Sequence, residues 1–397
     1  MSVDLKARLR RYKDAHKLSA STTEEPRATL ITQSTTEEEK NSWPDWTEAG
    51  FKTLKREVLL ELEAPVPEAF PAALPIVVPD LSEYIPLRMG KLPSSGELLF
   101  FDLETTGLSG GAGTIAFLAA FGRFAKDCVS NDVALAITQY LLLDYPGEAD
   151  FIERVAGEFT ALPPPLVITY NGKSFDSQIL KNRCLMNGMV PPEYFHADLL
   201  HPARRLWKRT LPDCSQATIE VSVLGLDRAG DVPGAMAPEI WFSFLRNGDN
   251  TELLSICDHN VRDITGLASL FLALNAIAAA PLESQNRFRF DMEALALIWR
   301  SAIRRNPQLF GDEEKKTGEE LFRDAAQNGS PFAALILAKN AEWRLKDYKL
   351  ALEYTDSALA SQEISEELRE NFERRRRRLE RKINHHNKLT GSTSTSR

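Results

Sequence analysis

Two acidic residues stand two positions apart at the end of an apolar run, Phe100-Phe101-Asp102-Leu103-Glu104. In a β-strand, residues i and i+2 point to the same face, so the Asp102 and Glu104 carboxylates would project together from the end of a strand. Adjacent carboxylates raise each other's pKa unless a cation neutralises them, and a set of oxygen ligands suits Mg²⁺ or Mn²⁺. The alternative is a pair of solvated charges where a strand leaves its sheet.

Two later segments carry further residues of the same kind. Asp176 follows the apolar run Leu166–Tyr170 and opens a helical pattern, and His259 and Asp263 are four positions apart in a second helical stretch, where they share one face. Each has an ordinary alternative, an acidic residue in a first helical turn for Asp176 and a surface His–Asp pair for the other two. Their coincidence in one chain favours a joint role.

These segments, FDLETTG (101–107), NGKSFD (171–176) and HNVRD (259–263), resemble the three motifs of the DEDD (DnaQ-like) 3′–5′ exonuclease superfamily, which has a ribonuclease H-like fold. The details most resemble its YprB-like branch, whose members also carry a tetratricopeptide-like C-terminal region. The resemblance covers roughly Glu97–Ala280, about half the chain. One departure is that three residues separate His259 from Asp263, the spacing of the tyrosine subgroup, whereas the histidine subgroup has four.

The resemblance implies a 3′–5′ exonuclease that hydrolyses phosphodiester bonds of DNA or RNA with two Mg²⁺ or Mn²⁺ ions and receives a single-stranded 3′ end. It implies that Asp102 bridges the ions, that Glu104 and Asp263 complete one site, and that Asp176 supports the second. His259 would act as general base or orient the attacking water. Two alternatives are a nuclease-derived binding or scaffold protein and a phosphoesterase acting on small nucleotides.

Several residues near the motifs are candidates for contact with a nucleic acid. Thr105 and Gly107 precede and open a glycine-rich segment that admits a terminal nucleotide or simply connects two strands. Asn171 and Lys173 lie beside Asp176. A short helix near Pro202–Lys208 adds basic residues that suit phosphates, while its Leu206 and Trp207 are as well suited to the core; the basic candidates are Arg204, Arg205 and Lys208.

Around these residues the chain predicts an α/β fold. Three strand-like runs come first, Glu97–Leu103, Thr114–Phe124 and Val133–Leu143. A helix (Glu148–Leu162), the buried strand Leu166–Tyr170, a helix (Ser174–Asn187) and a long helical stretch (Glu252–Ala278) follow. This order predicts a ribonuclease H-like mixed sheet flanked by helices.

The remaining chain is divided into flanking segments. We predict disorder for residues 1–50, a proline-rich extended arm for 51–96, the exonuclease domain for 97–280, a small all-α, tetratricopeptide-like region for 281–385 and a disordered tail for 386–397. In the helical region, Ala351 and Ala358 are spaced for helix packing, with Trp343 and Tyr348 as packing aromatics. The run Arg374–Arg378 is explained best by ion pairs with glutamates of its own helix. This region is a candidate surface for a protein partner.

Composition limits the class of protein. The chain has 397 residues, 48 Lys and Arg against 56 Asp and Glu, and 43% hydrophobic residues, which is typical of a globular protein and excludes a uniformly basic one. Four cysteines lie far apart without a CxxC pair, which indicates reduced thiols in the cytoplasm. We expect no membrane span and no secretory signal, since no sufficiently long apolar window is present.

Overall fold

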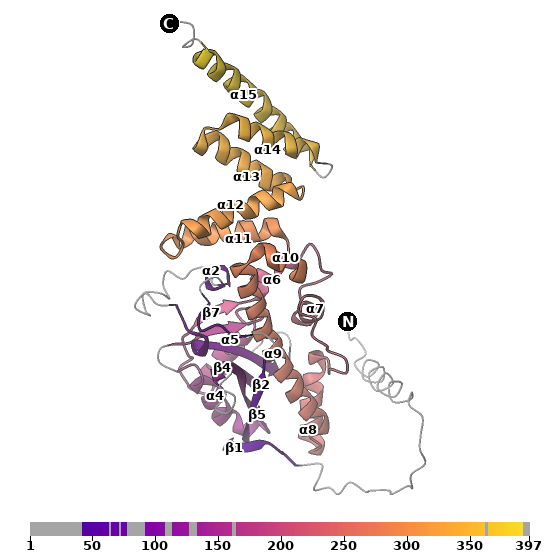
Figure 1. Ribbon diagram of the computed structural model, residues 1–397. Helices are drawn as coiled ribbons and strands as arrows, with labels where there is room; N and C mark the ends of the chain where they lie inside the picture. Colours follow the sequence, from indigo (N-terminus) through magenta and orange to yellow (C-terminus); the bar gives the residue numbers. More distant parts are fainter. Residues whose placement is uncertain are drawn as a thin grey trace, which may run out of the picture.

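The computed structural model describes residues 42–62, 65–70, 73–77, 92–107, 113–126, 133–160, 164–361 and 364–391. A seven-stranded sheet forms the body of the molecule, and the C-terminal helices extend from one end of it as a stacked column (Figure 1). The prediction of an α/β fold with a helical C-terminal region is confirmed.

The sheet is mixed. Its order is β1-β2-β5-β4-β3-β6-β7; β3, β6 and β7 pair in parallel and all other neighbours are antiparallel. The strands are β1 (Trp46–Gly50), β2 (Thr53–Glu61), β3 (Leu98–Thr105), β4 (Ala116–Lys126), β5 (Val133–Leu142), β6 (Leu166–Thr169) and β7 (Phe195–Asp198).

Helices cover both faces of the sheet, and this explains the continuous apolar sequence of the central strands. Within β3, Leu98 and Phe100 pack in one core cluster and Leu99 and Phe101 in the other. The helices up to the end of the sheet domain are α2 (Leu74–Val77), α4 (Glu148–Gly157), α5 (Asp176–Met186), α6 (Leu200–Trp207), α7 (Gln216–Ile219), the π-helical turn η4 (Glu220–Leu224), α8 (Ala237–Asn247) and α9 (Thr251–Ala279).

The N-terminal hairpin corrects two of the domain predictions. Trp46–Gly50, expected to be disordered, forms β1, and Thr53–Glu61, expected to belong to an extended arm, forms β2, which pairs with β5 over its whole length. The polar residues of β2 and the prolines that follow hide this strand from a search for apolar runs. The hairpin turn is also unmarked, because Lys52 adopts a positive φ of 52° without being glycine.

Helix α9 crosses the sheet at close range. An added Cβ on Gly122 of β4 would lie 2.6 Å from Cγ2 of Ile264, so the absence of a side chain at this position permits the crossing. By length and composition α9 could also cross a membrane, but 61% of its most apolar stretch is buried inside the protein, as expected of a core helix. In Figure 1 it runs from α8 to α10, beside the sheet.

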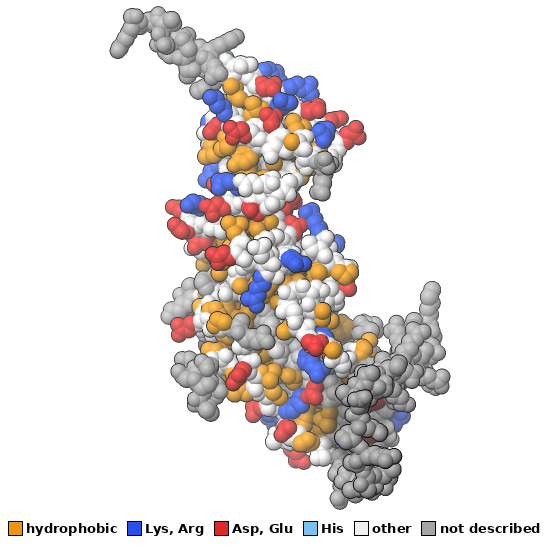
Figure 2. Space-filling model, turned by 45° about the vertical axis from the view of Figure 1, so that its right-hand side comes forward, with side chains coloured by type: hydrophobic (Ala, Val, Ile, Leu, Met, Phe, Trp, Pro, Cys, Tyr) orange, Lys and Arg blue, Asp and Glu red, His pale blue; other side chains and the backbone are white. Residues whose placement is uncertain are grey.

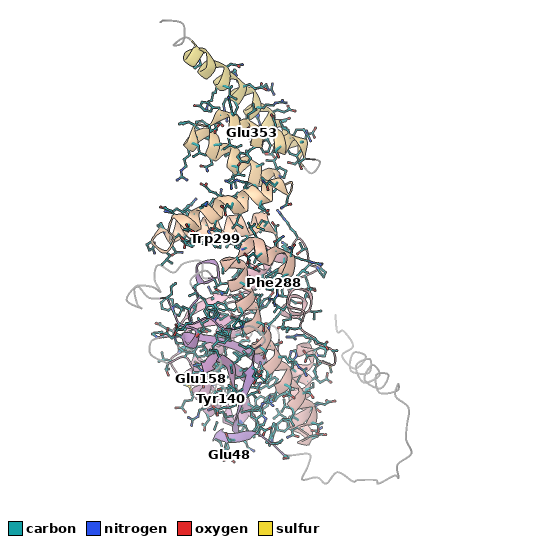
Figure 3. The ribbon with its side chains drawn as sticks, viewed as in Figure 1. Glu48, Tyr140, Glu158, Phe288, Trp299 and Glu353 are labelled. Atoms are coloured by element: carbon teal, nitrogen blue, oxygen red, sulfur yellow. The ribbon has the colours of Figure 1, made fainter. Side chains whose placement is uncertain are left out.

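On the opposite face, the end of α4 is tied to the antiparallel strands. The Tyr140 hydroxyl donates to Glu158 at 2.8 Å, and Arg123 forms an ion pair with the same carboxylate at 2.7 Å (Figure 3). Helix α5 packs beside α4, and the Arg183 guanidinium pairs with Glu148. These contacts fix the helices that follow β5 and β6.

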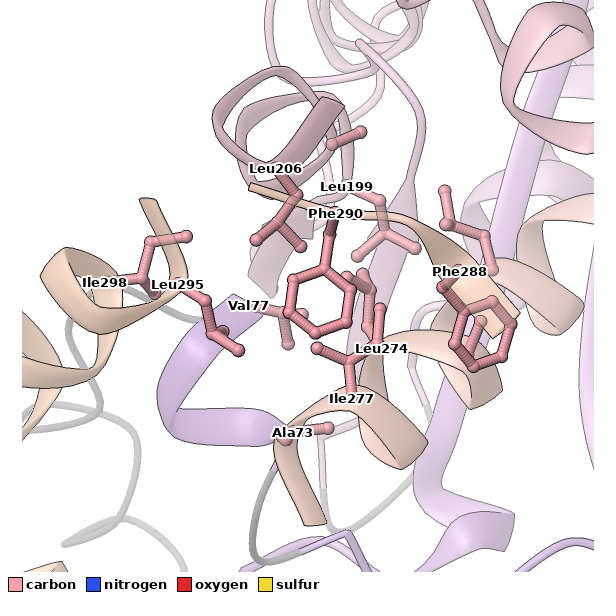
Figure 4. Packing of buried hydrophobic residues seen from close by; sticks show 14 of the residues in the cluster. Ala73, Val77, Leu199, Leu206, Leu274, Ile277, Phe288, Phe290, Leu295 and Ile298 are labelled. Carbon is pink, nitrogen blue, oxygen red and sulfur yellow. The ribbon is translucent and has the colours of Figure 1, made fainter. Parts of the chain in front are cut away.

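The C-terminal helices share their core with the sheet domain. Phe288, at the end of α10, and Phe290, before α11, belong to the same cluster as α6 and α9, and Phe290 lies among Leu206, Leu274 and Ile277 (Figure 4). The helices are α10 (Pro281–Phe288), α11 (Met292–Arg305), α12 (Asp312–Gln327), α13 (Pro331–Asn340), the π-helical turn η7 (Ala341–Leu345), α14 (Tyr348–Ala360) and α15 (Glu366–Gly391). Helix α15 therefore continues to Gly391, six residues into the segment predicted to be a disordered tail.

The arginine run in α15 is paired differently from the prediction. Only Arg376 pairs within its helix among the described ion pairs of this run, with Glu380 at 3.4 Å. Arg375, Arg378 and Lys382 converge instead on Glu342, a fully buried carboxylate in η7. A buried carboxylate requires cationic partners. These partners could not be predicted from the sequence, because more than thirty residues separate them from Glu342.

The predicted small residues Ala351 and Ala358 are buried between α14 and its neighbours, as expected. Trp343, expected to pack, is 57% exposed and lies under the Lys382 ammonium at 4.7 Å from the ring centroid. It therefore covers the Glu342 cluster from outside instead of filling the core.

We expect Gly122→Ala to lower the free energy of unfolding by about 1–3 kcal/mol, because α9 must move away from β4 to admit the methyl group. Urea unfolding followed by circular dichroism measures this change. Gly157→Ala at the end of α4, where an added Cβ meets nothing within 4 Å, is the matched control and should be neutral or stabilising. Equal stability of both variants would contradict the proposed close contact.

Candidate metal centre

The first two sequence motifs meet at the carboxyl end of β3. Asp102, Glu104 and Thr105 come from this strand, and Asn171 and Asp176 come from the connection between β6 and α5, which lies beside β3 because β3 and β6 are parallel neighbours. Together they line a pocket of about 200 Å³, completed by Leu103, Tyr170, Phe175, Gly234 and Pro238. The sheet topology alone therefore brings residues 102 and 176 to one place.

Helix α9 adds the third motif from one face. Nε2 of His259 lies 3.3 Å from Oδ2 of Asp263 and 3.9 Å from Oε1 of Glu104. Glu104, His259 and Asp263 present ligand atoms that all lie within 4.8 Å of one another. The three predicted motifs thus form one site.

The carboxylates of this site repel one another. Burial, followed by the charges of Asp176 and Asp263, raises the pKa of Asp102 well above its usual range. Burial and the charge of Asp102 do the same to the pKa of Glu104. Burial raises the pKa of Asp176 to about 7. Such a group of acidic side chains is stable in its charged form only with positive charge nearby.

A divalent cation fits this donor set. Asp102, Glu104, Asp176 and Asp263 offer only carboxylate oxygens, the ligands that Mg²⁺ and Mn²⁺ prefer, and His259 adds one imidazole nitrogen. Binding a cation would also relieve the repulsion that raises these pKa values. The residues predicted as metal ligands are therefore compatible with divalent metal ions.

Asp102 is held by a buried chain of hydrogen bonds that crosses the sheet. Nδ2 of Asn260 donates to Asp102 at 2.8 Å, and Gln139 of β5 donates to Oδ1 of Asn260 at 2.9 Å. Arg56 of β2 donates to Gln139 at 2.9 Å and to Asp258 of α9 at 3.0 Å. Asn260 and Gln139 are fully buried. The N-terminal hairpin thus takes part in placing Asp102.

The loop before α8 supplies residues that the sequence did not reveal. Oδ2 of Asp231 accepts a hydrogen bond from Nδ1 of His259 at 2.9 Å. Burial raises the pKa of Asp231, but the hydrogen bonds from His259 and Arg262 and the charges of His259 and Arg228 outweigh burial and lower this pKa. Arg228 pairs with Asp263 and Glu220. An added Cβ on Gly234 would lie 3.2 Å from Nε2 of His259, so this glycine leaves the site open.

Comparison with known proteins agrees with this arrangement. A family model described as RNase_H superfamily matches residues 99–275. These residues form a ribonuclease H-like domain. Over 323 residues, 73% of the chain, the protein is 29% identical to YprB of Bacillus subtilis (strain 168), an uncharacterized protein of which this match covers 76%.

Solved structures give more distant likenesses. The family B DNA polymerase of the archaeon Pyrobaculum calidifontis is 15% identical, with a TM-score of 0.33 over 52% of this chain and 29% of that one. Exonuclease I of E. coli, solved with a dT13 oligonucleotide, is 17% identical, with a TM-score of 0.27 over 40% of this chain and 42% of its own. The match therefore spans less than half the length of either solved chain.

The residues predicted to contact a substrate lie in two places, one around the acidic pocket and the other on α6. Thr105 is buried and its hydroxyl donates to the carbonyl of Gly107 at 3.0 Å, while residues 108–112 of the glycine-rich segment lie outside the described residues. Asn171 and Lys173 donate their backbone N–H groups to Asp198 at 2.8 and 3.1 Å, leaving the Lys173 side chain exposed. Asp198 therefore shapes the loop that carries Asp176.

The basic helix α6 lies apart from the acidic pocket of the ribonuclease H-like domain. Leu206 and Trp207 are fully buried, as the core alternative predicted, and the indole donates to the carbonyl of Phe288 at 2.9 Å. The basic side chains of α6 are exposed, namely Arg204, Arg205 and Lys208. They line none of the acidic pocket.

Replacing Asn260 tests the hydrogen-bond chain. In Asn260→Ala, Asp102 loses its side-chain donor, and we expect Mn²⁺ to bind about 10–100-fold more weakly, as is typical when a group that orients a ligand is removed. Isothermal titration calorimetry with Mn²⁺ measures this. Asn247→Ala, at the exposed end of α8, is the control and should bind as the wild type does. Unchanged affinity in Asn260→Ala would show that Asp102 is placed without Asn260.

Proposed function

We propose that this protein is a metal-dependent 3′–5′ exonuclease that hydrolyses phosphodiester bonds of a nucleic acid. The convergence of Asp102, Glu104, Asp176 and Asp263 around His259 in a ribonuclease H-like domain carries the proposal. A scaffold would gain nothing from four mutually repelling carboxylates. The activity is proposed together with a cytosolic location, which accords with free thiols at Cys184, Cys214 and Cys257.

Each carboxylate of the site would have its own role in phosphodiester hydrolysis. When bound, two Mg²⁺ or Mn²⁺ ions would activate the attacking water and stabilise the attacking and leaving oxygens of the phosphodiester. Asp102 and Glu104, on the same face of β3, and Asp263, on α9, would hold them from two sides, with Asp176 completing the set. The pocket between these side chains is where the scissile phosphate would lie.

His259 has the geometry of a general base. Because the Asp231 carboxylate accepts the proton on Nδ1, the lone pair of Nε2 faces the carboxylates of Glu104 and Asp263. A water among these groups can give its proton to Nε2 as it attacks phosphorus. The shortened spacing between His259 and Asp263 is accommodated because both residues lie on one helix face, one turn apart.

Removal of Asp102 tests the proposed activity. We expect Asp102→Ala to abolish Mn²⁺-dependent shortening of 5′-labelled single-stranded DNA and RNA from the 3′ end, while wild type is inactive in EDTA. Because the change also removes repulsion among buried carboxylates, the variant should unfold at the same temperature as wild type or higher. Glu153→Ala, on the exposed side of α4, is the control and should retain activity.

The same assay separates the alternatives. A wild type that hydrolyses dinucleotides but no longer strand would favour the small-nucleotide phosphoesterase. A folded wild type that binds Mn²⁺ and shortens none of these substrates would overturn the exonuclease proposal.

Asp231→Asn tests the orientation of His259. The amide keeps the size of the side chain but removes the negative charge that holds Nδ1, and we expect kcat to fall about 10–100-fold with little change in KM. Steady-state kinetics on a labelled single strand measures both constants. Asp227→Asn, in the same loop but directed at the backbone of Ala229, should leave both unchanged. An Asp231→Asn variant with wild-type kcat would contradict the role given to this carboxylate.

A further inference from the structure

A second, larger groove lies between α6 and α11. Its volume is about 1100 Å³, and its walls are the basic helix of the ribonuclease H-like domain and the second helix of the C-terminal region. In Figure 1 these two helices lie next to each other where the C-terminal column begins. The backbone N–H of Asp291 donates to the carbonyl of Leu206 at 2.8 Å, which fixes one wall to the other.

The groove concentrates positive charge in a protein of net charge −8. Each wall contributes three exposed basic side chains: Arg204, Arg205 and Lys208 from α6, and Arg300, Arg304 and Arg305 from α11. Within the described part of the chain, none of the six forms an ion pair; Arg300 contacts only the Phe322 ring, at 5.4 Å from its centroid. Elsewhere on the C-terminal helices, basic and acidic side chains are interspersed (Figure 2).

The two acidic residues of the groove are already engaged. Asp291 caps α11, accepting from the Ala294 N–H at 2.9 Å, and pairs with Arg209 at 3.0 Å. Glu293 accepts a hydrogen bond from the Ser330 hydroxyl and lies 3.9 Å from Arg209. The six unpaired cations therefore repel one another without compensation from the protein. Binding of a polyanion would remove this repulsion.

Hydrogen bonds join the lining of the acidic pocket to the chain on either side of α6. Tyr170 lines that pocket, and its hydroxyl donates to the carbonyl of Cys214 at 2.5 Å. Arg204, which lines the groove, affects the pKa of Tyr170. Burial raises the pKa of this phenol, and the Arg204 charge opposes that rise. Asp198, the last residue of β7, joins the pocket loop to the start of α6. The α6 wall of the groove is therefore connected to the acidic pocket through Tyr170 and Asp198.

We infer that this groove binds the sugar–phosphate backbone of the strand whose 3′ end enters the metal centre. The inference rests on the proposed function and extends it, because α11 belongs to the C-terminal helices and not to the ribonuclease H-like domain. Arg and Lys contact phosphates irrespective of base, and Leu297 and Ile298 offer apolar surface between the charges. The helical region thereby contributes half of a binding surface for single-stranded nucleic acid.

The test uses the full chain and two matched double variants. Arg304→Glu/Arg305→Glu reverses two charges on α11, and Arg374→Glu/Arg377→Glu reverses two exposed arginines on α15 that lie outside the groove. Binding of fluorescein-labelled dT20 and rU20 is followed by fluorescence anisotropy in EDTA over a range of NaCl concentrations. Hydrolysis of a dinucleotide with Mn²⁺ is measured in parallel.

We expect the α11 variant to bind both 20-mers at least tenfold more weakly, while the α15 variant binds as wild type. Loss of two phosphate contacts should reduce the slope of log K against log salt by about 1.4. Dinucleotide hydrolysis should be unchanged, because the acidic pocket is intact. Arg304→Gln/Arg305→Gln should show the same reduction in slope, which separates lost contacts from an unfavourable charge at the end of α11.

Equal affinity of the α11 variant and wild type, or an equal loss in the α15 variant, would overturn the groove. The outcome is independent of catalysis: a wild type that binds 20-mers through the groove but hydrolyses nothing would support the groove while overturning the proposed exonuclease. A wild type that binds neither 20-mer would overturn the groove even if it hydrolyses dinucleotides.

Discussion

The repulsion among Asp102, Glu104, Asp176 and Asp263 is the constraint on which the rest of the structure depends. Burial raises the pKa values of the first three, and the charges of neighbouring site carboxylates add to this for Asp102 and Glu104, so bringing them together opposes folding. The fold resists this cost by taking the four carboxylates from three rigid elements: two from the end of β3, one from the start of α5 and one from α9. Their positions follow from backbone geometry, so no attraction among the side chains is needed. Binding of cations would release the charge repulsion retained in this way.

Helix α9 makes most of the contacts that position the residues of the site. It supplies His259 and Asp263 to the site, Asn260 to Asp102, and Asp258 to Arg56 of the N-terminal hairpin. The close contact at Gly122 fixes how far this helix lies from the sheet. Because one helix makes all these contacts, a small displacement of α9 would move Asp263, His259 and the support of Asp102 together. A change in core packing at α9 would therefore also change the geometry of the site.

The sequence predicted the residues that carry charge more reliably than the residues that hold them. Asp102 and Glu104 follow from the two-residue period of a strand, and His259 with Asp263 from the helical period, since both relations are local. Asn260 and Gln139 contact partners 158 and 121 positions away, and nothing near them in the sequence marks that contact. Asp231 and Gly234 lie in a loop without periodicity. The hairpin of β1 and β2 was missed because three consecutive charged residues, Lys55 to Glu57, interrupt the apolar pattern of β2, and its turn lacks glycine at Lys52.

The boundary at Pro281 divides the chain by topology but not by packing. Helix α9 ends at Ala279 and α10 begins two residues later, yet Phe288, Phe290 and Leu295 lie in the same apolar cluster as Leu206 and Ile277. A core shared in this way holds α11 at a fixed angle to α6, which a flexible linker would not do. The unpaired cations of the two helices therefore line one groove. Because the helical region shares this core, the basic residues of α11 would keep a set position relative to the acidic pocket.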